Sequence, residues 1–494
     1  MPFIENPQKP DGLPVVPLWI NGAIHPTSGK DDLFPVVSSI QNKPIHYAVS
    51  ATSETAVLAV ESAAASLISW RKTTPSHRRA LLLKAASVLE SKKEEVMRTQ
   101  MAETSCPEGF ARFNMGSTAW MREIAAATSQ LKGTVAQNLG EANGEEGEGL
   151  SLVVREPIGV VLIIPPWNGA VILPVRAISM ALAAGCSIVV KASELCPRTH
   201  HLLLEAFEEA GIPPGVINMI QVKREDAAAV TEAIVAHKAV RKVDFIGSAA
   251  IGSKIGQLCA KYLKPVLMEL GGKGPAVVLE DADLENAARL CAMGAIMDHG
   301  QLCFSTERII VHRGIYDAFV KHLTTAFSAM PTAGDAVTRQ SAKASFTYAQ
   351  DKGATFLAGG LQYLSETSLK PTLVTNVSRD ARIFDEETFG PSASVYMAED
   401  DDDAVEKAND SAYGLNAGVH SQSWEHAFAI AKRLEYGQVH INNVTCTDAP
   451  GVAIQGVKGS GWGSSNSIWG IEEFTVQKSI YFHPTGGLGM FEKH

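Results

Sequence analysis

The sequence predicts an α/β protein built on parallel sheets that helices cover. From residue 159 onward, short apolar stretches alternate with stretches of helical composition, and this βαβ order is typical of parallel sheets. Hydrophobic residues make up 46% of the chain and charged residues 19%, which is the composition of a globular protein. A chain of 494 residues is too long for one ordinary core, so we expect two or three domains.

The first part of the chain is predicted to be helical. Residues 54–100 are rich in Ala, Leu, Glu and Lys, and a second helical stretch is expected over 108–131. The acidic, glycine-rich segment 141–149 is interpreted as a surface loop. Residues 150–157 alternate between apolar and polar side chains, as a strand of a hairpin would.

The alternating region begins at residue 159. Strands are predicted at GVVLII, SIVVK, VINMI, KVDFI and KPVLMEL, with helices near 172–184 and 199–210 between them. The pattern starts again after Glu269 with PAVVLE, a helix from about residue 284 and the strand RIIVH, so a second α/β domain is expected there. Near the end, EEFTVQKSIYFHP alternates as an edge strand would, and its expected partner is the strand of the 150s or another subunit.

Charge and composition argue against several classes of partner. The 43 basic and 53 acidic residues give a net charge of −10, which disfavours nucleic acid and anionic membranes. Residues 159–190 contain one charge, Arg176, but prolines interrupt them, so a buried α/β segment is predicted and not a membrane span. The N-terminus lacks a signal-peptide pattern, so we expect a cytoplasmic protein with free thiols.

No metal site is predicted. The chain contains neither a CxxC nor an HExxH motif. The run EDDDD at 399–403 is interpreted as the start of a helix, where carboxylates favour the positive end of the helix dipole. A metal site is the alternative interpretation of this run, but no ligand spacing supports it.

Two segments have the local chemistry of a nucleotide site. GSAAIG at 247–252 follows a predicted strand and opens a helix, where free N–H groups and the dipole favour a phosphate. A plain helix cap is the other interpretation of this turn. Glu194 follows the strand SIVVK at the carboxyl edge of the sheet, where a carboxylate can bind a ribose diol and repel a 2′-phosphate.

Cys303 is a candidate nucleophile on the turn-like segment HGQLCFSTER (299–308). A cysteine nucleophile needs thiolate character, access and an oxyanion partner, whereas a buried cysteine is inert. His299 lies four residues earlier and suggests a Cys–His hydrolase pair, but no orienting third residue is evident. Both interpretations of Cys303 stay open on local features.

Seven motifs together carry more information than each does alone. PPWNG, KASE, FIGSAAIG, MELGGKGP, GQLCFSTER, EETFGPS and YGLNAGV occur in this order. With this spacing the chain resembles the NAD(P)-dependent aldehyde dehydrogenase superfamily over essentially its whole length. The strings KASELCPRTH, CFSTER, VHINN and EEFT are most similar to salicylaldehyde and vanillin dehydrogenases within that superfamily.

The resemblance implies a Rossmann-like cofactor domain, a second α/β catalytic domain and a small β oligomerisation element. The cofactor domain is expected to comprise residues 1–137 and 158–269, and the catalytic domain residues 270–473. The oligomerisation strands are expected in 138–157 and 474–494. The resemblance further implies a homodimer or a homotetramer.

The resemblance also implies a mechanism. Cys303, the cysteine of GQxC, would attack the aldehyde carbon, and the Asn168 side chain with the Cys303 backbone N–H would bind the oxyanion. Hydride transfer to the cofactor leaves a thioester, which Glu269 of ELGGK would hydrolyse by activating water.

Ten residues are expected to hold the cofactor. They are Lys191 and Glu194 at the adenosine ribose, Gly247, Ser248 and Gly252 at the pyrophosphate, Pro166 and Trp167 along the dinucleotide, Glu387 and Phe389 at the nicotinamide ribose and ring, and Leu270 at the carboxamide. Glu194 favours NAD, although some family members with this glutamate also use NADP.

The substrate side of the resemblance points to an aryl aldehyde. Arg176 lies two helical turns after Asn168, where it would bind a phenolic oxygen or a carboxylate, or form an internal salt bridge. Gly169 replaces a bulky aromatic residue of many relatives and would leave room for a ring. The other expected pocket residues are Trp120, Leu302 and Phe304.

Two segments depart from the pattern of the family. QVKRED (221–226) stands in place of a glycine-rich turn, and AIQGVKGSGWG (453–463) in place of PFGGxKxSG. In the family the glycine-rich turn contacts the cofactor, and the first departure leaves that contact unassigned in this chain. The second departure changes the loop that helps to close the substrate side. The alternative functions are an aldehyde dehydrogenase for an aliphatic or semialdehyde substrate, a thiol hydrolase without redox chemistry, and a binding protein on the same fold.

Overall fold

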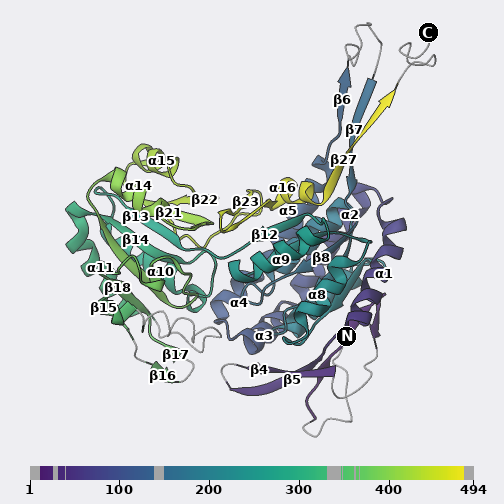
Figure 1. Cartoon of the computed structure of the whole chain (residues 1–494), viewed down its shortest axis with the longest axis horizontal. Coiled ribbons are helices and arrows are strands. Elements are labelled where there is room, and N and C mark those ends of the chain that lie inside the picture. The colour runs from purple at the N-terminus through teal and green to yellow at the C-terminus, as the bar shows by residue number, and fades with distance from the viewer. Residues whose placement is uncertain are drawn as a thin grey trace.

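The protein consists of two lobes, each built around one sheet, and a three-stranded arm (Figure 1). The computed structural model describes residues 12–25, 32–38, 41–137, 150–330, 347, 349–360, 363–365 and 368–482. The acidic segment 141–149 lies outside these residues. The fold is the mixed α/β architecture that the sequence predicts.

The first sheet has eight strands in the order β25-β12-β11-β8-β9-β10-β2-β3. Its five central strands are parallel: β8 (Val160–Ile164), β9 (Ser187–Lys191), β10 (Ile217–Ile220), β11 (Val240–Ile246) and β12 (Val266–Glu269). The edges are antiparallel: β2 (Leu18–Ile20), β3 (Ala23–His25) and β25 (Gly461–Trp462). The predicted strands of this region are confirmed.

Helices cover both faces of the first sheet because its strands are apolar on both sides. Val161 and Ile163 of β8 pack into one core, and Val160 and Leu162 pack into the other. The first core takes residues from α2 (Pro75–Ser91), α5 (Ser117–Ala127), α6 (Ile172–Ala184) and α7 (Pro197–Glu209), and the second from α1 (Ser53–Trp70), α8 (Ala227–Ala236) and α9 (Ala249–Lys261). Residues 159–190 thus form a strand, a helix and a strand, and no helix in the described ranges is long and apolar enough to cross a membrane.

The two long helical stretches are divided more finely than predicted. Residues 54–100 fall into α1, α2 and the start of α3 (Lys93–Thr104), and 108–131 into α4 (Glu108–Asn114), α5 and a 3-10 turn at 128–130. Ser105 in the left-handed region and Pro107 before α4 account for the break between α3 and α4.

The second sheet has seven strands in the order β15-β18-β19-β14-β13-β21-β22. Its strands are β13 (Gly274–Val278), β14 (Thr306–His312), β15 (Thr355–Ala358), β18 (Thr372–Thr375), β19 (Ser392–Ala398), β21 (Asn416–His420) and β22 (Gln438–Ile441). Only the edge strand β15 is antiparallel among these described strands. One face is covered by α10 (Leu284–Ile296) and α11 (Tyr316–Ala329), and the other by α14 (Asp401–Asn409) and α15 (Trp424–Ala431).

The acidic run at 399–403 begins α14, as predicted. The Asp400 carboxylate caps this helix by accepting a hydrogen bond of 2.9 Å from the Asp403 N–H. The residues that the structure describes contain no group of three or more His, Cys, Asp or Glu side chains placed to hold a metal ion.

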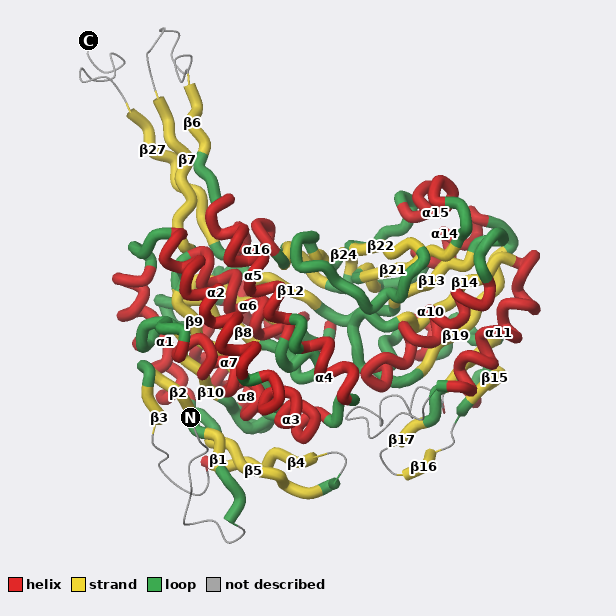
Figure 2. The backbone as a smooth tube through the Cα atoms, turned by 180° about the vertical axis from the view of Figure 1, so that it is seen from behind, coloured by secondary structure: helices red, strands yellow, loops and turns green. Residues whose placement is uncertain are grey.

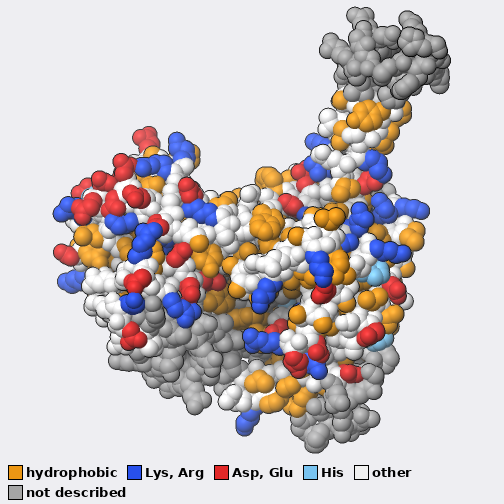
Figure 3. Space-filling view, in the orientation of Figure 1, with side chains coloured by type: hydrophobic (Ala, Val, Ile, Leu, Met, Phe, Trp, Pro, Cys, Tyr) orange, Lys and Arg blue, Asp and Glu red, His pale blue; other side chains and the backbone are white. Residues whose placement is uncertain are grey.

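The arm consists of β6 (Thr134–Gln137), β7 (Leu150–Pro157) and β27 (Thr475–Phe482), paired antiparallel in the order β27-β7-β6. It projects away from the first lobe (Figure 2). The predicted pairing of the last strand with the strand of the 150s is therefore confirmed. Apolar side chains along the arm, among them Val135, Tyr481 and Phe482, are exposed (Figure 3).

Near its end the chain returns to the first lobe. Strand β25 pairs with β12, and α16 (Ser467–Glu473) contacts α5 and α6. Residues 461–473, which were expected in the catalytic domain, thus pack against the first lobe. The short elements elsewhere are β1 (Val15–Val16), β4 (Leu33–Ser38), β5 (Lys43–Val49), β16 (Tyr363–Ser365), β17 (Ser368–Leu369), α13 (Arg382–Asp385), β20 (Tyr413–Gly414), β23 (Ile454–Gln455), β24 (Val457–Lys458) and β26 (Ser464–Ser465).

Helix α9 ends on a leucine where glycine is favoured, which generates a stability prediction. Leu263 has a φ of 53° and is 90% exposed, and the Lys264 N–H bonds to the Cys259 carbonyl at 2.9 Å, as in a Schellman motif. Leu263→Gly should therefore raise the free energy of unfolding by up to about 1 kcal/mol. Leu263→Val is the control and should lower the thermal midpoint, because a β-branched side chain fits this conformation less well. A lower midpoint for Leu263→Gly would contradict this explanation.

Candidate active site

The three predicted catalytic residues come from three connections that meet between the lobes. Glu269 is the last residue of β12, Asn168 lies between β8 and α6, and Cys303 lies between α10 and β14. The Asn168 Nδ2 donates to the Gln301 carbonyl at 2.8 Å, which joins the first lobe to the cysteine segment. A Cβ on Gly272 would lie 2.4 Å from the Cys303 carbonyl oxygen, so the connection after Glu269 also packs against that segment.

Cys303 differs from the other six cysteines, which are all buried, because it retains partial exposure. Burial raises the pKa of its thiol well above the usual range, and the carboxylates of Glu269 and Glu387 raise it further. The guanidinium of Arg176 opposes these effects. The thiol is therefore neutral near pH 7 and needs a base or a bound cation to become nucleophilic.

The turn before Cys303 has an unusual backbone. Asp298, His299 and Gly300 have φ values of 48°, 59° and 71°, and the two non-glycine residues cost roughly 1–2 kcal/mol each. A Cβ on Gly300 would lie 2.1 Å from the Gly390 carbonyl oxygen, so this turn packs against the EETFGP segment. The His299 Nε2 lies 3.3 Å from the Ser105 carbonyl, an orientation that gives the Cys–His hydrolase hypothesis no support.

A buried ion pair that sequence reasoning missed holds the backbone of the Glu387–Phe389 segment. Lys273 pairs with Glu307, whose carboxylate also accepts hydrogen bonds from the Thr388 N–H at 2.9 Å and the Phe389 N–H at 3.4 Å. The sequence does contain a signal for this pair. Opposite charges occur in two otherwise apolar segments, the lysine in ELGGK and the glutamate in CFSTER.

Glu387 and Phe389 face the other predicted cofactor residues. The Glu387 Oε1 accepts a hydrogen bond of 3.0 Å from the Gly272 N–H, and burial raises the pKa of Glu387 to about 8. The Phe389 ring stands edge-on to Trp167 with 6.1 Å between ring centroids. The structure thus brings residues of PPWNG, ELGGK and EETFGP together.

The start of α9 has the features of an anion site. Ser248 occupies the N-cap position but makes no side-chain cap hydrogen bond, so N–H groups of the first turn remain available. The Gly247 N–H donates to the Glu269 carbonyl at 3.1 Å, and a Cβ on Gly252 would lie 2.5 Å from Leu270 Cδ2. These contacts place the helix start directly beside Leu270.

A cleft of about 380 Å³ separates this end of α9, at Ala249, from Arg382 and Tyr413 of the second lobe.

Lys191 is the last residue of β9, and Glu194 follows it three residues later. Burial lowers the pKa of Lys191, and the nearby Glu194 carboxylate opposes this effect. Pro166 lies after the neighbouring strand β8.

The unusual QVKRED segment has a structural reason, because the buried Gln221 donates to the Val16 and Pro17 carbonyls at 3.2 and 3.1 Å and so anchors the N-terminal strands.

The apolar residues among the predicted substrate residues fall into two apolar clusters. Trp120 is buried with Ile172, Leu173 and Ile246, while Leu302 and Phe304 pack near Val444 and Cys446. The expectation of free space at Gly169 is not met, because a Cβ there would lie 2.7 Å from Leu173 Cδ1. The first turn of α6 causes this packing, since the Leu173 N–H bonds to the Gly169 carbonyl at 3.1 Å.

Arg176 forms the internal salt bridge that was one of its two predicted roles. Its Nη2 pairs with Oε2 of Glu269, and its Nη1 lies 3.7 Å from Oδ2 of Asp448. Asp448 is held in turn by the Asn466 Nδ2 at 3.1 Å. Sequence reasoning missed Asp448 and Asn466, which lie in a segment without a recognised motif.

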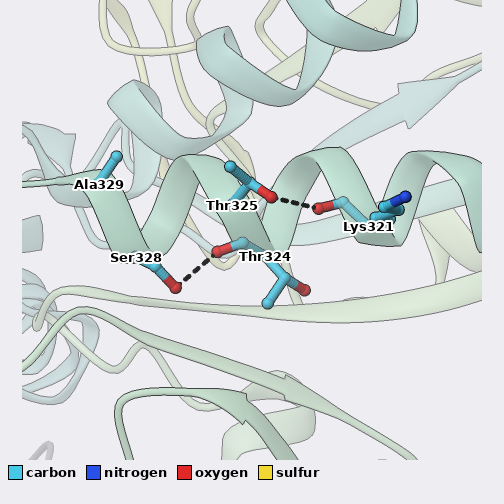
Figure 4. Close-up of a pocket in the computed structure, with 5 residues that line it drawn as sticks. All are labelled: Lys321, Thr324, Thr325, Ser328 and Ala329. Atoms are coloured by element: carbon cyan, nitrogen blue, oxygen red, sulfur yellow. Dashed lines mark hydrogen bonds between the residues drawn. The ribbon is translucent and has the colours of Figure 1, made fainter.

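Another hollow lies on the exposed side of α11 and has no part in this site. Its lining includes Thr324, Thr325 and Ser328 (Figure 4). The Thr325 and Ser328 hydroxyls donate to helix carbonyls one turn earlier, at 3.0 and 2.8 Å. These polar groups are satisfied within the helix and define no ligand chemistry.

Comparison with known proteins identifies the class to which this fold and site belong. A family model described as aldehyde dehydrogenase family matches residues 25–480, and the chain belongs to that family. It is an oxidoreductase that acts on aldehydes, in a family that uses NAD(P).

Several relatives are named for aromatic aldehydes. The chain is 39% identical to a vanillin dehydrogenase of Pseudomonas sp. (strain HR199 / DSM 7063), with 93% of this chain and 96% of that protein covered. It is 34% identical to a salicylaldehyde dehydrogenase of Pseudomonas putida, with 94% and 98% covered. The crystal structure of a salicylaldehyde dehydrogenase from Pseudomonas putida G7, complexed with salicylaldehyde, matches with a TM-score of 0.92 at 32% identity and covers 97% of this chain and 100% of that one.

The charges around Cys303 generate a pH prediction. The pKa of Glu387 is about 8, so this carboxyl is charged in the more alkaline range where the thiol titrates. Glu387→Gln removes that negative charge, so the alkylation rate of Cys303 should begin to rise at lower pH than in the wild type. Iodoacetamide labelling followed by peptide mass analysis measures this rate, and the glutamine keeps an acceptor for the Gly272 N–H. An unchanged profile, or one displaced to higher pH, would show that Glu387 does not act on the thiol.

Proposed function

We propose that this protein oxidises an aromatic, hydroxylated aldehyde to the carboxylic acid with NAD, through a thioester on Cys303. The observation that carries the proposal is the meeting of Asn168, Glu269 and the cysteine segment at one buried place, fixed by the Asn168–Gln301 hydrogen bond of 2.8 Å. The names of the relatives support the aromatic substrate.

Attack by the Cys303 sulfur on the aldehyde carbon places negative charge on the carbonyl oxygen. Asn168 carries two amide hydrogens, and the Gln301 carbonyl accepts one of them. The other meets no acceptor among the residues that the structure describes, so it is available to the oxyanion with its orientation already fixed. A preorganised donor of this kind typically contributes roughly 3–4 kcal/mol to the transition state.

The cofactor supplies the acceptor for the hydride that leaves the resulting thiohemiacetal. The residues proposed to hold it fit that task, because α9 offers uncapped N–H groups and Leu270 packs directly on Gly252. Glu194 beside Lys191 suits the two hydroxyls of an adenosine ribose. Glu387 and Phe389 lie on the opposite lobe, across from Trp167.

Glu269 then takes a proton from water that attacks the thioester carbon. The C–S bond breaks, the acid departs and the Cys303 thiol is restored. Glu269 is buried, so few other waters compete with the one it orients.

The apolar clusters around Trp120 and Phe304 support the proposed aromatic preference. A semialdehyde substrate is the alternative. One relative, 35% identical over 74% of this chain and 81% of that protein, is a succinate-semialdehyde dehydrogenase of Deinococcus radiodurans.

We further propose that the exposed apolar arm joins subunits into a homodimer or homotetramer. The cytoplasm is the proposed location.

A panel of aldehydes tests the substrate class. Salicylaldehyde and vanillin should give kcat/KM values roughly tenfold or more above that of succinate semialdehyde when NADH formation is followed.

Cys303→Ala should abolish NADH formation with every aldehyde while NAD still binds, because no nucleophile remains. Turnover in that variant, or turnover without NAD, would refute the mechanism, and a preference for the semialdehyde would refute the aromatic assignment.

Cofactor choice is tested at Glu194. Glu194→Ser removes the charge that repels a 2′-phosphate, so the ratio of kcat/KM with NADP to that with NAD should rise roughly tenfold or more. Glu209→Ser, an exposed carboxylate at the end of α7, serves as the control and should leave the ratio unchanged. A constant ratio in Glu194→Ser would place the discrimination elsewhere.

A further inference from the structure

Arg176 is buried among more carboxylates than a simple salt bridge requires. Besides Glu269 and Asp448, the carboxyl group of Asp244 and the thiol of Cys303 are near enough to act on the charge of its guanidinium. Burial alone would lower the pKa of Arg176, but these groups raise it above the usual value. The guanidinium is therefore the positive centre of a buried cluster that includes the proposed base.

The cluster is a consequence of strand register. Asp244 of β11 pairs with Leu267 of β12, two residues before Glu269, so Asp244 and Glu269 point to the same face of the sheet. Ile163, paired with Asp244 on the other side, packs into the core that contains α6. Arg176 thus descends from α6 onto the face that carries both carboxyl groups.

The two oxygens of Glu269 have different surroundings. Oε2 is engaged by Arg176, whereas Oε1 is buried and has no hydrogen-bond partner within the ranges that the structure describes. A buried acceptor without a partner is costly unless a ligand or water satisfies it. Oε1 is consequently the atom available to the water of hydrolysis.

The guanidinium is itself held from the other side. Asp448 faces Nη1, and Asn466 fixes Asp448 while donating to the Ala449 and Val452 carbonyls at 3.2 and 3.0 Å. Arg176 therefore has a defined position between two anchored carboxyl groups. Removing it would leave three buried acidic groups without their cation.

We propose that Arg176 is a positioning residue for thioester hydrolysis, which holds Glu269 through Oε2 so that Oε1 accepts the proton of the attacking water. This inference rests on the proposed function. In the step, the water oxygen bonds to the thioester carbon, its proton passes to Oε1 and the C–S bond breaks. The sulfur then recovers the proton from Glu269, so the acid and the thiol are the products and no electrons are exchanged with a further reagent.

Rapid mixing of enzyme, NAD and aldehyde separates the steps. Arg176→Gln should still release about one NADH per subunit in a burst, because Cys303 and Asn168 remain, although the burst is slower since the guanidinium no longer lowers the pKa of the thiol. The variant should then turn over roughly tenfold or more slowly than the wild type, a larger fall than that of the burst rate. Arg176→Lys keeps the charge and should recover part of the steady rate. Arg78→Gln is the control for loss of a buried guanidinium, since Arg78 donates to the Ala183 and Thr73 carbonyls and not to a carboxylate.

The pH profile of the steady rate gives a second readout. Glu269, Asp448, Asp244 and Cys303 face Arg176, and Lys242 and Glu473 in turn face Asp244. Burial raises the pKa of Asp244 and of Asp448, and the charge of Arg176 opposes this effect. The acidic limb of the profile should therefore move to higher pH in Arg176→Gln and not in Arg78→Gln.

Two results would overturn the inference. One is an increase in the KM for aldehyde with the steady rate and the acidic limb unchanged, which would make Arg176 a substrate-binding residue only. The other is an equal fall of burst and steady rates without a change in the acidic limb. Failure of the proposed function is recognised separately, because the wild type would then form no NADH or Cys303→Ala would remain active.

Discussion

Four residues, Leu270 to Lys273, connect the last parallel strand of the first sheet to the first strand of the second. A connection this short brings the carboxyl end of β12 to the edge of the other lobe and leaves little freedom between them. Gly272 lets the cysteine segment approach the connection, and its N–H holds Glu387. The proposed base, the proposed nucleophile and the proposed nicotinamide residues are therefore positioned by one constraint.

Charge is the second organising feature of the site. Buried ion pairs seldom add much net stability, because desolvation offsets the attraction between the charges. The Arg176–Glu269 and Lys273–Glu307 pairs are better understood as fixing positions: one orients a carboxylate in the first lobe, and the other shapes the Glu387–Phe389 segment in the second. Both pairs lie next to the connection between the sheets.

The sequence predicts the architecture well where patterns are long and local. Apolar strands that alternate with helices identify both sheets, and the alternation in EEFTVQKSIYFHP identifies the third strand of the arm. Helix breaks at Ser105 depend on single backbone angles that composition does not encode. The partner of Arg176 could not be predicted either, because 93 residues separate Arg176 from Glu269. The two meet only through the packing of α6 on the sheet and the register of β12. Gly169 shows the opposite error, since a missing side chain predicts space only when no neighbour packs against it.

The arm also has a consequence for the order of folding. Strand β27 begins more than 300 residues after β7 ends, yet it forms the longer of the two pairings in the arm. During synthesis the hairpin of β6 and β7 emerges long before its third strand, and a lone two-stranded hairpin has little stability in water. The nascent chain therefore exposes an incomplete sheet edge until translation reaches the last strand, and this interval is when the protein is most open to aggregation or to pairing with the wrong strand.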